Sequence, residues 1–409
     1  MTLVYRTAEP HEYAALIETM SAAFLDRPDV ARAAEGLAGI WQPERTWAAF
    51  EGTQAVGTFH SWGTELTVPG LARIPVAAVS AVTVLPTHRR RGILTELSAR
   101  EHAALQERGE IAAILYASEY PIYGRFGYGP ATRWATWTVD TRMARMRRDG
   151  PGGVELVLPH ADLEPVLRGA FERVRVAHAG EIRRRDITWG YRMGLREEPW
   201  GDRWKGFLAL RRDAAGEVDG FVRYSGKESW AHHVPQNEIN VQELVAATDE
   251  AYDALWRFLL ELDLVARISI DPAREHERLP WVLVNARAAR AEDPGEGLWV
   301  RLFDVARALE TRTYEQSGSL VLDVVDPAAV GGRHRLALDV SPDGATCRPT
   351  DRLPDVALDV AALGAAYLGG TPVRRAVLVA GADEHTPGAL RALDAMLRTV
   401  DAPHCSTFF

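Results

Sequence analysis

The sequence has very little cysteine and no apolar run long enough to cross a bilayer. Cys347 and Cys405 are the only cysteines in 409 residues, too few for a disulfide framework and not spaced as metal ligands. Cys405 near the end is expected to be a small apolar residue or an incidental thiol, not a nucleophile. The histidines are scattered without carboxylate or cysteine partners at ligand spacing. No stretch of about 18 apolar residues occurs, and the opening MTLVYRTAEPHEY lacks the regions of a signal peptide. These absences predict a cytoplasmic protein with no metal and no membrane insertion.

Lysine is also almost absent, since Lys205 and Lys227 are the only two. Arginine therefore supplies nearly all of the basic charge, and an arginine cluster is weak evidence for a binding site. Residues 183–185 (RRR) have no strand, glycine and helix around them, so we expect a solvated face there. The net charge of −9 disfavours nucleic acid as a partner and favours cationic small molecules.

One arginine cluster, residues 88–94 (HRRRGIL), lies between a predicted strand and a predicted helix. The strand is the β-branched run at 79–85, which Pro86 ends. The helix shows in apolar residues that recur at helical spacing until Gly109, namely Ile93, Leu94, Leu97, Ala104 and Leu105. The first turn of a helix presents unpaired N–H groups and the positive end of its dipole. This order therefore predicts a site for a diphosphate; taken alone, the segment is also compatible with a solvated surface face.

A second segment favours the diphosphate site over a solvated surface face. Residues 111–117 (IAAILYA) predict a buried strand, and a glycine-punctuated turn, IYGRFGYG, follows at 122–129. At this point the chain resembles the GNAT acetyltransferase superfamily, where a basic glycine turn and a helix hold the acetyl-CoA pyrophosphate. There a tyrosine after the next strand faces the thioester sulfur. More narrowly, THRRRGIL, ASE and IYGRFGYGPAT are similar to the Eis (enhanced intracellular survival) family of actinobacterial N-acetyltransferases, and the likeness runs along the whole chain.

The resemblance implies roles for individual residues. Tyr123 matches the family's tyrosine and would be the general acid, whereas Tyr128 is expected to pack. Phe24 and Asp26 match positions that line the acceptor pocket, although Asp26 is equally compatible with a helix-end or turn position. The residues that would hold acetyl-CoA are Val82, Thr83, Val84, Arg90, Arg91, Gly92, Ile93, Leu94, Thr95, Ser118 and Glu119. Leu94 departs from the small residue usual in the superfamily, and Eis proteins resemble this variant.

The resemblance also makes the α-carboxylate of Phe409 the catalytic base. An aromatic anchor that fixes this group in a cleft would desolvate it and raise its basicity. The alternative is a frayed terminus, but two consecutive aromatics, Phe408 and Phe409, would then leave an apolar patch in water. Some family members have a carboxylate where this chain has Phe408, which leaves polyamine affinity and the range of aminoglycosides open.

The expected fold class is α/β (α+β), with two tandem GNAT-like domains followed by a sterol carrier protein-like domain. Residues 1–145 would be the catalytic domain, with a first helix at 10–25 and hairpin strands at 56–60 and 65–68. The glycine-rich segment 147–153 would be a linker. Residues 154–288 would form a second GNAT-like domain without a CoA site, because residues 248–250 (TDE) are acidic where phosphate needs basic ones. Residues 289–409 would supply the terminal carboxylate.

The predicted function is acetyl-CoA-dependent N-acetylation of polycationic small-molecule amines such as aminoglycosides, at one or several positions. Acetyl-CoA would be a co-substrate, no nucleic acid would bind, and the family likeness implies a homo-oligomer, a hexamer. Two alternatives stay open: a regulatory protein-lysine acetyltransferase, and a catalytically idle scaffold that binds CoA or a lipid.

Overall fold

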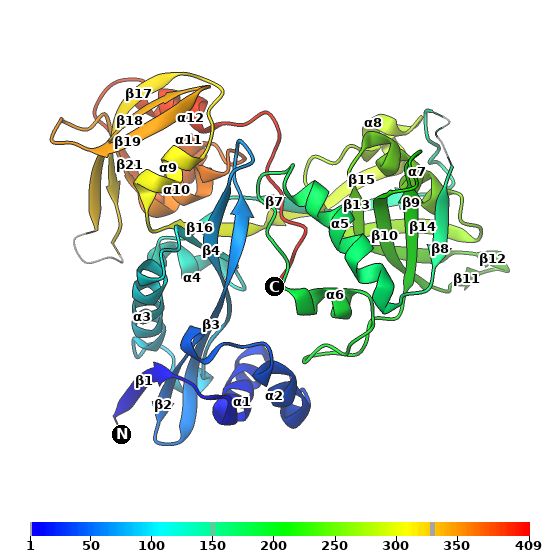
Figure 1. Cartoon of the computed structure of the whole chain (residues 1–409), viewed down its shortest axis with the longest axis horizontal. Coiled ribbons are helices and arrows are strands. Elements are labelled where there is room, and N and C mark those ends of the chain that lie inside the picture. The colour runs from blue at the N-terminus through cyan, green and yellow to red at the C-terminus, as the bar shows by residue number, and fades with distance from the viewer. Residues whose placement is uncertain (1, 149, 151, 328–331) are drawn as a thin grey trace. The chain divides into compact units, whose positions relative to one another are not determined.

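The computed structural model describes the chain apart from residues 1, 149, 151 and 328–331. Its contacts divide the chain into two compact units. The first comprises Met1–Thr132, Glu198–Asp202 and Gly297–Phe409, and the second comprises Arg133–Glu197 and Arg203–Glu296. Figure 1 labels the helices and strands of both units.

The first unit contains a seven-stranded sheet in the order β1-β2-β3-β4-β5-β16-β6. Only β4 and β5 pair in parallel, and the other neighbours are antiparallel. Its strands are β1 (Leu3–Thr7), β2 (Thr46–Glu51), β3 (Gln54–Thr67), β4 (Arg73–Val84), β5 (Ala112–Tyr116), β6 (Gly129–Pro130) and β16 (Leu298–Leu302). Its helices are α1 (Tyr13–Phe24), α2 (Val30–Ala38), α3 (Ile93–Glu107) and α4 (Tyr120–Tyr123), with short 3-10 turns at η1 (Pro10–Glu12), η2 (Pro43–Arg45), η3 (Pro86–His88) and η4 (Gly124–Phe126).

Strand β3 corrects one prediction, because residues 54–67 form a single strand and not two hairpin strands at 56–60 and 65–68. The polar stretch at 61–64 stays extended because it pairs residue by residue with 79–76 of β4. Figure 1 shows the two long strands side by side. The actual turn lies beyond Thr67, where Val68 donates its N–H to the carbonyl of Ala72 at 2.9 Å. Cross-strand pairing decided this conformation, and local periodicity did not reveal it.

The rest of the first unit is a five-stranded sheet in the order β19-β18-β17-β20-β21 with helices beside it. Helix α10 is buried along its whole length and packs on β16 and β6 of the seven-stranded sheet. A Cβ atom at Gly129 would collide with the carbonyl of Ala361, and one at Gly364 with that of Val300. The elements are β17 (Gly318–Val325), β18 (Arg333–Ser341), β19 (Gly344–Pro349), β20 (Val356–Asp359), β21 (Ala382–Glu384), α9 (Val305–Thr311), α10 (Val360–Tyr367), α11 (Val373–Ala380) and α12 (Ala389–Leu397).

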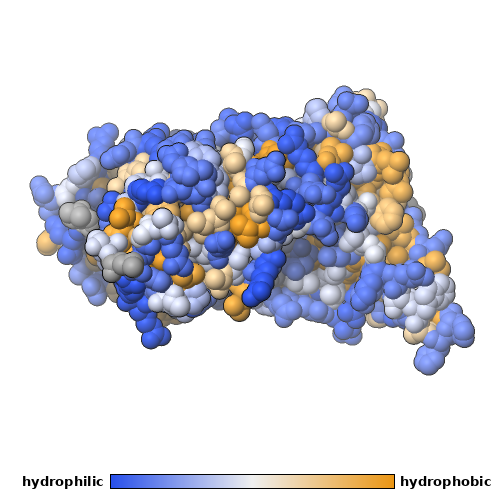
Figure 2. Space-filling view, turned by 90° about the horizontal axis from the view of Figure 1, so that it is seen from below, coloured by the Kyte–Doolittle hydropathy of each residue, from blue (hydrophilic) through white to orange (hydrophobic). Residues whose placement is uncertain are grey.

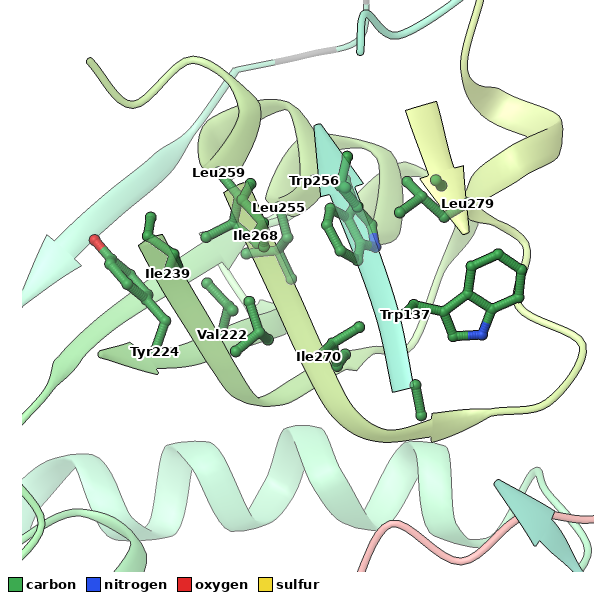
Figure 3. Close-up of a cluster of buried hydrophobic side chains, with 14 of the residues drawn as sticks. Trp137, Val222, Tyr224, Ile239, Leu255, Trp256, Leu259, Ile268, Ile270 and Leu279 are labelled. Atoms are coloured by element: carbon green, nitrogen blue, oxygen red, sulfur yellow. The ribbon is translucent and has the colours of Figure 1, made fainter. Parts of the chain in front are cut away.

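The second unit contains a seven-stranded sheet in the order β15-β7-β14-β13-β10-β9-β8, in which β13 and β14 are the parallel pair. Figure 3 shows its core, where Trp256 and Leu255 of α7 lie over Val222, Ile239 and Ile268 of the strands. The strands are β7 (Arg133–Asp140), β8 (Val154–Val157), β9 (Phe207–Arg212), β10 (Val218–Lys227), β11 (Trp230–Ala231), β12 (Val234–Pro235), β13 (Asn237–Ala246), β14 (Val265–Arg274) and β15 (Ala289–Glu296). The helices are α5 (Glu164–Arg175), α6 (Asp186–Arg192), α7 (Asp249–Leu260) and α8 (Leu279–Val282), with 3-10 turns η5 (Ala161–Leu163) and η6 (Ala286–Ala288).

The boundaries of the sheets differ from the expected domain ranges 1–145, 154–288 and 289–409, because two strands belong to a sheet of another range. Strand β7 lies within the first range but belongs to the sheet of the second unit. Strand β16 lies within the last range but completes the first sheet between β5 and β6. The segment 147–153 lies inside the second unit, where Arg257 donates to the carbonyl of Gly150 at 2.7 Å; its residues 149 and 151 are outside the described residues.

The solvated face predicted for residues 183–185 is present at Arg183, which is exposed, but the prediction is wrong for Arg184 and for the partly buried Arg185. Arg184 is buried, with Nη2 2.6 Å from Oε1 of Glu243 and its guanidinium 3.6 Å from the centre of the Phe171 ring. Arg192 and Arg223 contact the same carboxylate at 3.0 and 3.3 Å. Burial opposes ionisation of Glu243, but the three guanidinium groups hold its pKa below the usual range. A buried cation persists here because a buried anion pairs with it.

The surface in Figure 2 is mostly hydrophilic, with apolar side chains scattered among charged ones. Among the described residues, we find no helix with the length and hydropathy needed to cross a bilayer.

Candidate functional site

The first sheet opens between β4 and β5. The two strands pair only over residues 76–78 of β4 and 112–114 of β5, while β4 continues to Val84 with β3 on its other side. Residues 79–84 therefore present one backbone edge that β5 does not cover, and such an edge can pair with the amides of a ligand. The predicted residues Val82, Thr83 and Val84 lie on this segment.

A β-bulge bends β4 inside this opening. The register shifts between Thr58 and His60 of β3, and across from the shift Ala81 has a positive φ of 52°. The Thr58 hydroxyl donates to the carbonyl of Ala81 at 2.7 Å and lies 2.6 Å from the Thr83 hydroxyl. These contacts fix the bulge, a feature common beside active sites. No local pattern pointed to Thr58, because its role depends on pairing with β4.

The basic turn forms the start of α3, as predicted. Gly92 is the residue before the helix and has a φ of 78°, and Arg90 also has a positive φ, of 65°. Turns that contain left-handed residues can direct successive N–H groups into an anion-binding concavity. Arg90, Arg91, Gly92 and Thr95 are exposed, whereas the Ile93 side chain is 2% exposed and Leu94 is half-buried. Ile93 and Leu94 would thus offer their backbone N–H groups to a phosphate while their side chains anchor the turn in the core.

Glu51 on β2 organises this turn. Its carboxylate lies 3.2 Å from Nη2 of Arg91 and 3.3 Å from Nε2 of His88. The hydrogen bond from His88 and the charge of Arg91 lower the pKa of Glu51. A carboxylate so close to the turn would compete with a phosphate for the guanidinium of Arg91.

Tyr123 ends α4 and is 7% exposed. Burial raises the pKa of its hydroxyl, and a hydrogen bond with the Ser118 side chain opposes that shift, so the phenol is protonated at neutral pH. Ser118 and Glu119, the other predicted residues of this loop, are exposed. Tyr128 packs beside Tyr123 with ring centroids 6.1 Å apart, and its hydroxyl lies 3.0 Å from Nε2 of the buried His102.

The C-terminal segment lies on the same sheet. The Tyr116 hydroxyl, at the end of β5, donates to the carbonyls of Cys405 and Thr407 at 3.4 and 3.2 Å. The Phe409 ring is 5.2 Å from the Tyr116 ring and 5.7 Å from the ring of Trp62 on β3. These contacts anchor the segment to the two strands that flank β4, so the described chain does not fray here. Cys405 is buried, consistent with its expected role as a small apolar residue.

The two predicted acceptor residues lie at the end of α1. Phe24 is 52% exposed, and Asp26 is exposed with its carboxylate accepting the N–H of Arg27 at 2.7 Å. Asp26 also donates its own N–H to the carbonyl of Ser21 at 3.1 Å. Among the described residues, none of these bonds joins Phe24 or Asp26 to Tyr123 or Phe409. The helix-end arrangement of Asp26 is present, and acceptor binding stays a prediction.

Glu101 is a buried carboxylate that the sequence did not single out. It lies on α3 with no exposed surface, accepts a hydrogen bond from the Ser61 hydroxyl of β3 and has Nη1 of Arg108 3.9 Å away. Burial raises its pKa from 4.5 to about 7, although Ser61 and Arg108 act in the opposite direction.

This raised pKa predicts a pH-dependent stability. Between pH 4.5 and about 7 the folded chain holds a proton on Glu101 that the unfolded chain has lost, so stability falls as pH rises through this window. Glu101→Gln removes the burial cost but also the attraction to Arg108, so it should stabilise the protein by about 2 kcal/mol at pH 8. The gain should vanish below pH 4.5. Urea unfolding at both pH values measures it, with the exposed Glu96→Gln on the same helix as the control; equal gains at both pH values would show that Glu101 does not titrate there.

The corresponding corner of the second unit has the opposite chemistry. Strand β13 leads into α7, but the Thr248 hydroxyl caps this helix by accepting the N–H of Ala251 at 3.1 Å. Asp249 and Glu250 occupy its first turn, and Asp249 forms an ion pair with Arg278. A capped, acidic helix start repels phosphate, and the single CoA site expected in the first domain stays a prediction.

Three family models match successive parts of the chain. Two models of an acetyltransferase (GNAT) domain match residues 4–131 and 180–302, and a model of a sterol carrier protein domain matches residues 305–406. The predicted fold class, two GNAT domains followed by a sterol carrier protein-like domain, is confirmed. GNAT acetyltransferases use acetyl-CoA.

Relatives extend the likeness over the whole chain. An uncharacterized N-acetyltransferase of Streptomyces avermitilis is 40% identical over 412 residues, covering 97% of this chain and 96% of the relative. N-acetyltransferase Eis of Mycobacterium tuberculosis is 37% identical over 369 residues, covering 87% and 84%. The crystal structure of Eis1 from Mycobacterium abscessus has a TM-score of 0.86 at 35% identity and covers 99% of this chain and 100% of its own.

Proposed function

Because this chain belongs to the Eis family of GNAT N-acetyltransferases, we propose that it transfers the acetyl group of acetyl-CoA to primary amines of polycationic acceptors such as aminoglycosides. Membership of the family supports acetyltransferase activity. One observation carries the proposed site: a single sheet bears the opened edge of β4, the basic start of α3, Tyr123 and the anchored C-terminal segment. The net charge of −9 supports a cationic acceptor, since it attracts such molecules at long range.

Residues of the basic turn would hold the diphosphate of acetyl-CoA. Backbone N–H groups of residues 92–95 and the guanidinium groups of Arg90 and Arg91 supply charge-assisted donors. The uncovered edge at residues 82–84 would hydrogen-bond the amides of the pantetheine arm and the acetyl carbonyl, and Ser118 and Glu119 would border it. Polarising that carbonyl stabilises the negative charge that develops on its oxygen.

Two groups would move protons during transfer. The amine nitrogen forms a bond to the acetyl carbon, and the carbon–sulfur bond breaks. The Phe409 carboxylate would take a proton from the attacking nitrogen, and the Tyr123 hydroxyl would give one to the departing thiolate. The aromatic contacts of Phe409 with Trp62 and Tyr116 support this role, because they hold the carboxylate on the sheet.

Phe24 and Asp26 would contribute to the acceptor site, where the Asp26 carboxylate would pair with a substrate ammonium group. Phe408, 68% exposed, provides no charge at the penultimate position. We therefore propose that acceptors bind through carboxylates elsewhere in the site, of which Asp26 is one. By family likeness we further propose that the protein is cytoplasmic and that it forms a hexamer. Light scattering of the purified protein tests the oligomeric state.

A substrate panel separates this function from its alternatives. Thiol release from acetyl-CoA is measured with aminoglycosides, polyamines and lysine-containing peptides at equal concentration. The proposal predicts turnover with the aminoglycosides. Turnover with peptides alone would favour a regulatory protein-lysine acetyltransferase, and no turnover with any amine would favour an idle scaffold.

Glu51 provides a smaller prediction for the same site. Glu51→Gln removes a negative charge beside the diphosphate and releases Arg91, so the KM for acetyl-CoA should fall about two- to threefold at low salt, the size expected of an exposed charge. The difference should shrink as salt is raised. Glu155→Gln, which breaks the exposed pair with Arg212 in the second unit, is the control, and a KM for Glu51→Gln that rises would show that Glu51 serves to position Arg91.

A further inference from the structure

A buried arginine connects the turn after Tyr123 to the sterol carrier protein-like domain. Arg301 lies on β16 and is 2% exposed. Its Nη1 donates to the carbonyl of Phe126 at 2.6 Å. The same guanidinium contacts both carboxylate oxygens of Asp326, at 3.2 and 2.8 Å. Asp326 directly follows β17, the central strand of the C-terminal domain, and is itself buried.

The turn that follows Tyr123 leaves space for this guanidinium at Gly127. The turn closes through a bond from the Gly127 N–H to the carbonyl of Gly124 at 2.9 Å, and Tyr128 donates its N–H to the carbonyl of Tyr123 at 3.3 Å. Gly127 has a φ of 82°, and Nη1 of Arg301 occupies the place where a Cβ atom would lie. A side chain at this position would therefore exclude the arginine from the turn.

We propose that Asp326, acting through Arg301, is a positioning residue for acyl transfer, so that the C-terminal domain fixes the turn that sets the place of the Tyr123 hydroxyl. This inference rests on the proposed function, because it takes Tyr123 as the general acid. A bidentate carboxylate holds the guanidinium in one orientation, and the guanidinium in turn holds the Phe126 carbonyl. A shift of about 1 Å in a reacting group can cost up to about a hundredfold in rate, so an interaction remote from the substrate can limit kcat.

The chain offers a matched control three residues away. Asp323 lies on β17, has no exposed surface and pairs with Arg333 and Arg335, but none of its described bonds reaches the turn after Tyr123. Asp326→Asn should lower kcat on the order of tenfold and leave the KM for acetyl-CoA within about twofold. Asp323→Asn should keep kcat within about twofold, since it disturbs the same domain but not the turn.

A double-mutant cycle distinguishes positioning from a general loss of structure. In a Tyr123→Phe background the hydroxyl is gone, so adding Asp326→Asn should change kcat by less than about twofold. An equal loss in both backgrounds, or an equal loss in Asp323→Asn, would overturn the proposal. If Asp326→Asn does not fold, Arg301→Met combined with Asp326→Leu replaces the buried pair by apolar side chains, a change that buried pairs often tolerate. Full kcat in that folded variant would overturn the proposal as well.

The failure of this inference differs from failure of the proposed function. If Tyr123→Phe is inactive while the Asp326 variants are fully active, Tyr123 keeps its role and only the positioning proposal falls. If Tyr123→Phe retains full activity, the acid assignment and the inference fall together.

Discussion

Tyr123→Phe should lower kcat by about a hundredfold, the usual contribution of a positioned general acid. The substitution removes one hydroxyl from a side chain that is 7% exposed and leaves the ring in the core. Because burial raises the pKa of this phenol, the hydroxyl is protonated at neutral pH and can donate to a thiolate. The KM for acetyl-CoA should change little, because the predicted contacts of the cofactor lie on β4, on the basic turn with the first residues of α3, and at Ser118 and Glu119, and the substitution removes none of these residues.

Tyr120 provides the control for that experiment. It lies in the same short helix, is 46% exposed and packs against Trp299. Tyr120→Phe should keep kcat within about twofold, because an exposed hydroxyl contributes little to stability or to the reaction. Initial rates of thiol release from acetyl-CoA, measured on the two variants and the unmodified protein, give the kcat values to compare. Full activity of Tyr123→Phe would remove the acid assignment.

Displacement of the terminal carboxylate should have an effect of similar size. One glycine added after Phe409 moves the charged group by about 3.5 Å, beyond hydrogen-bond reach of the amine it would deprotonate. We expect kcat to fall on the order of a hundredfold, as for loss of a general base. The rings of Phe408 and Phe409 should keep their contacts with Tyr116 and Trp62, so the melting temperature should stay unchanged.

A C-terminal amide at Phe409, introduced by protein ligation, distinguishes loss of the carboxylate charge from displacement of the carboxylate. It retains every residue and removes only the negative charge, and it should reduce kcat as strongly as the added glycine. The ligated protein with a free carboxylate is the control. If both the extended and the amidated proteins react at the unmodified rate, the base must be another group.

The sequence allowed a good prediction of the elements that carry local patterns. The basic turn, α3 and β5 were predictable because a glycine, a capping position and helical or strand periodicity lie within a few residues of each other. The fold class and family followed from motifs in the same segments. The role of the Phe409 carboxylate was expected from family likeness, whereas the contacts of the Phe409 ring with Tyr116 and Trp62 were not predicted and no local pattern contained them.

Other features depend on residues far apart in the chain. Residues 61–64 looked like a break within a hairpin, yet pairing with β4 keeps them extended. Arg184 looked exposed because its partner, Glu243, lies far along the chain on β13. Arg301 and Asp326 carry no motif, and the hydrogen bond of Arg301 to the Phe126 carbonyl spans 175 residues of sequence. Long-range pairing of buried charges is therefore the part of this site that a single sequence did not reveal.

Mass spectrometry of an aminoglycoside incubated with the protein and acetyl-CoA tests the central claim most directly. The account predicts a product heavier by one or more acetyl groups, formed at an initial rate that Tyr123→Phe and the added terminal glycine each reduce on the order of a hundredfold. An unmodified aminoglycoside, or an acetylated one formed equally fast by all three proteins, would contradict it.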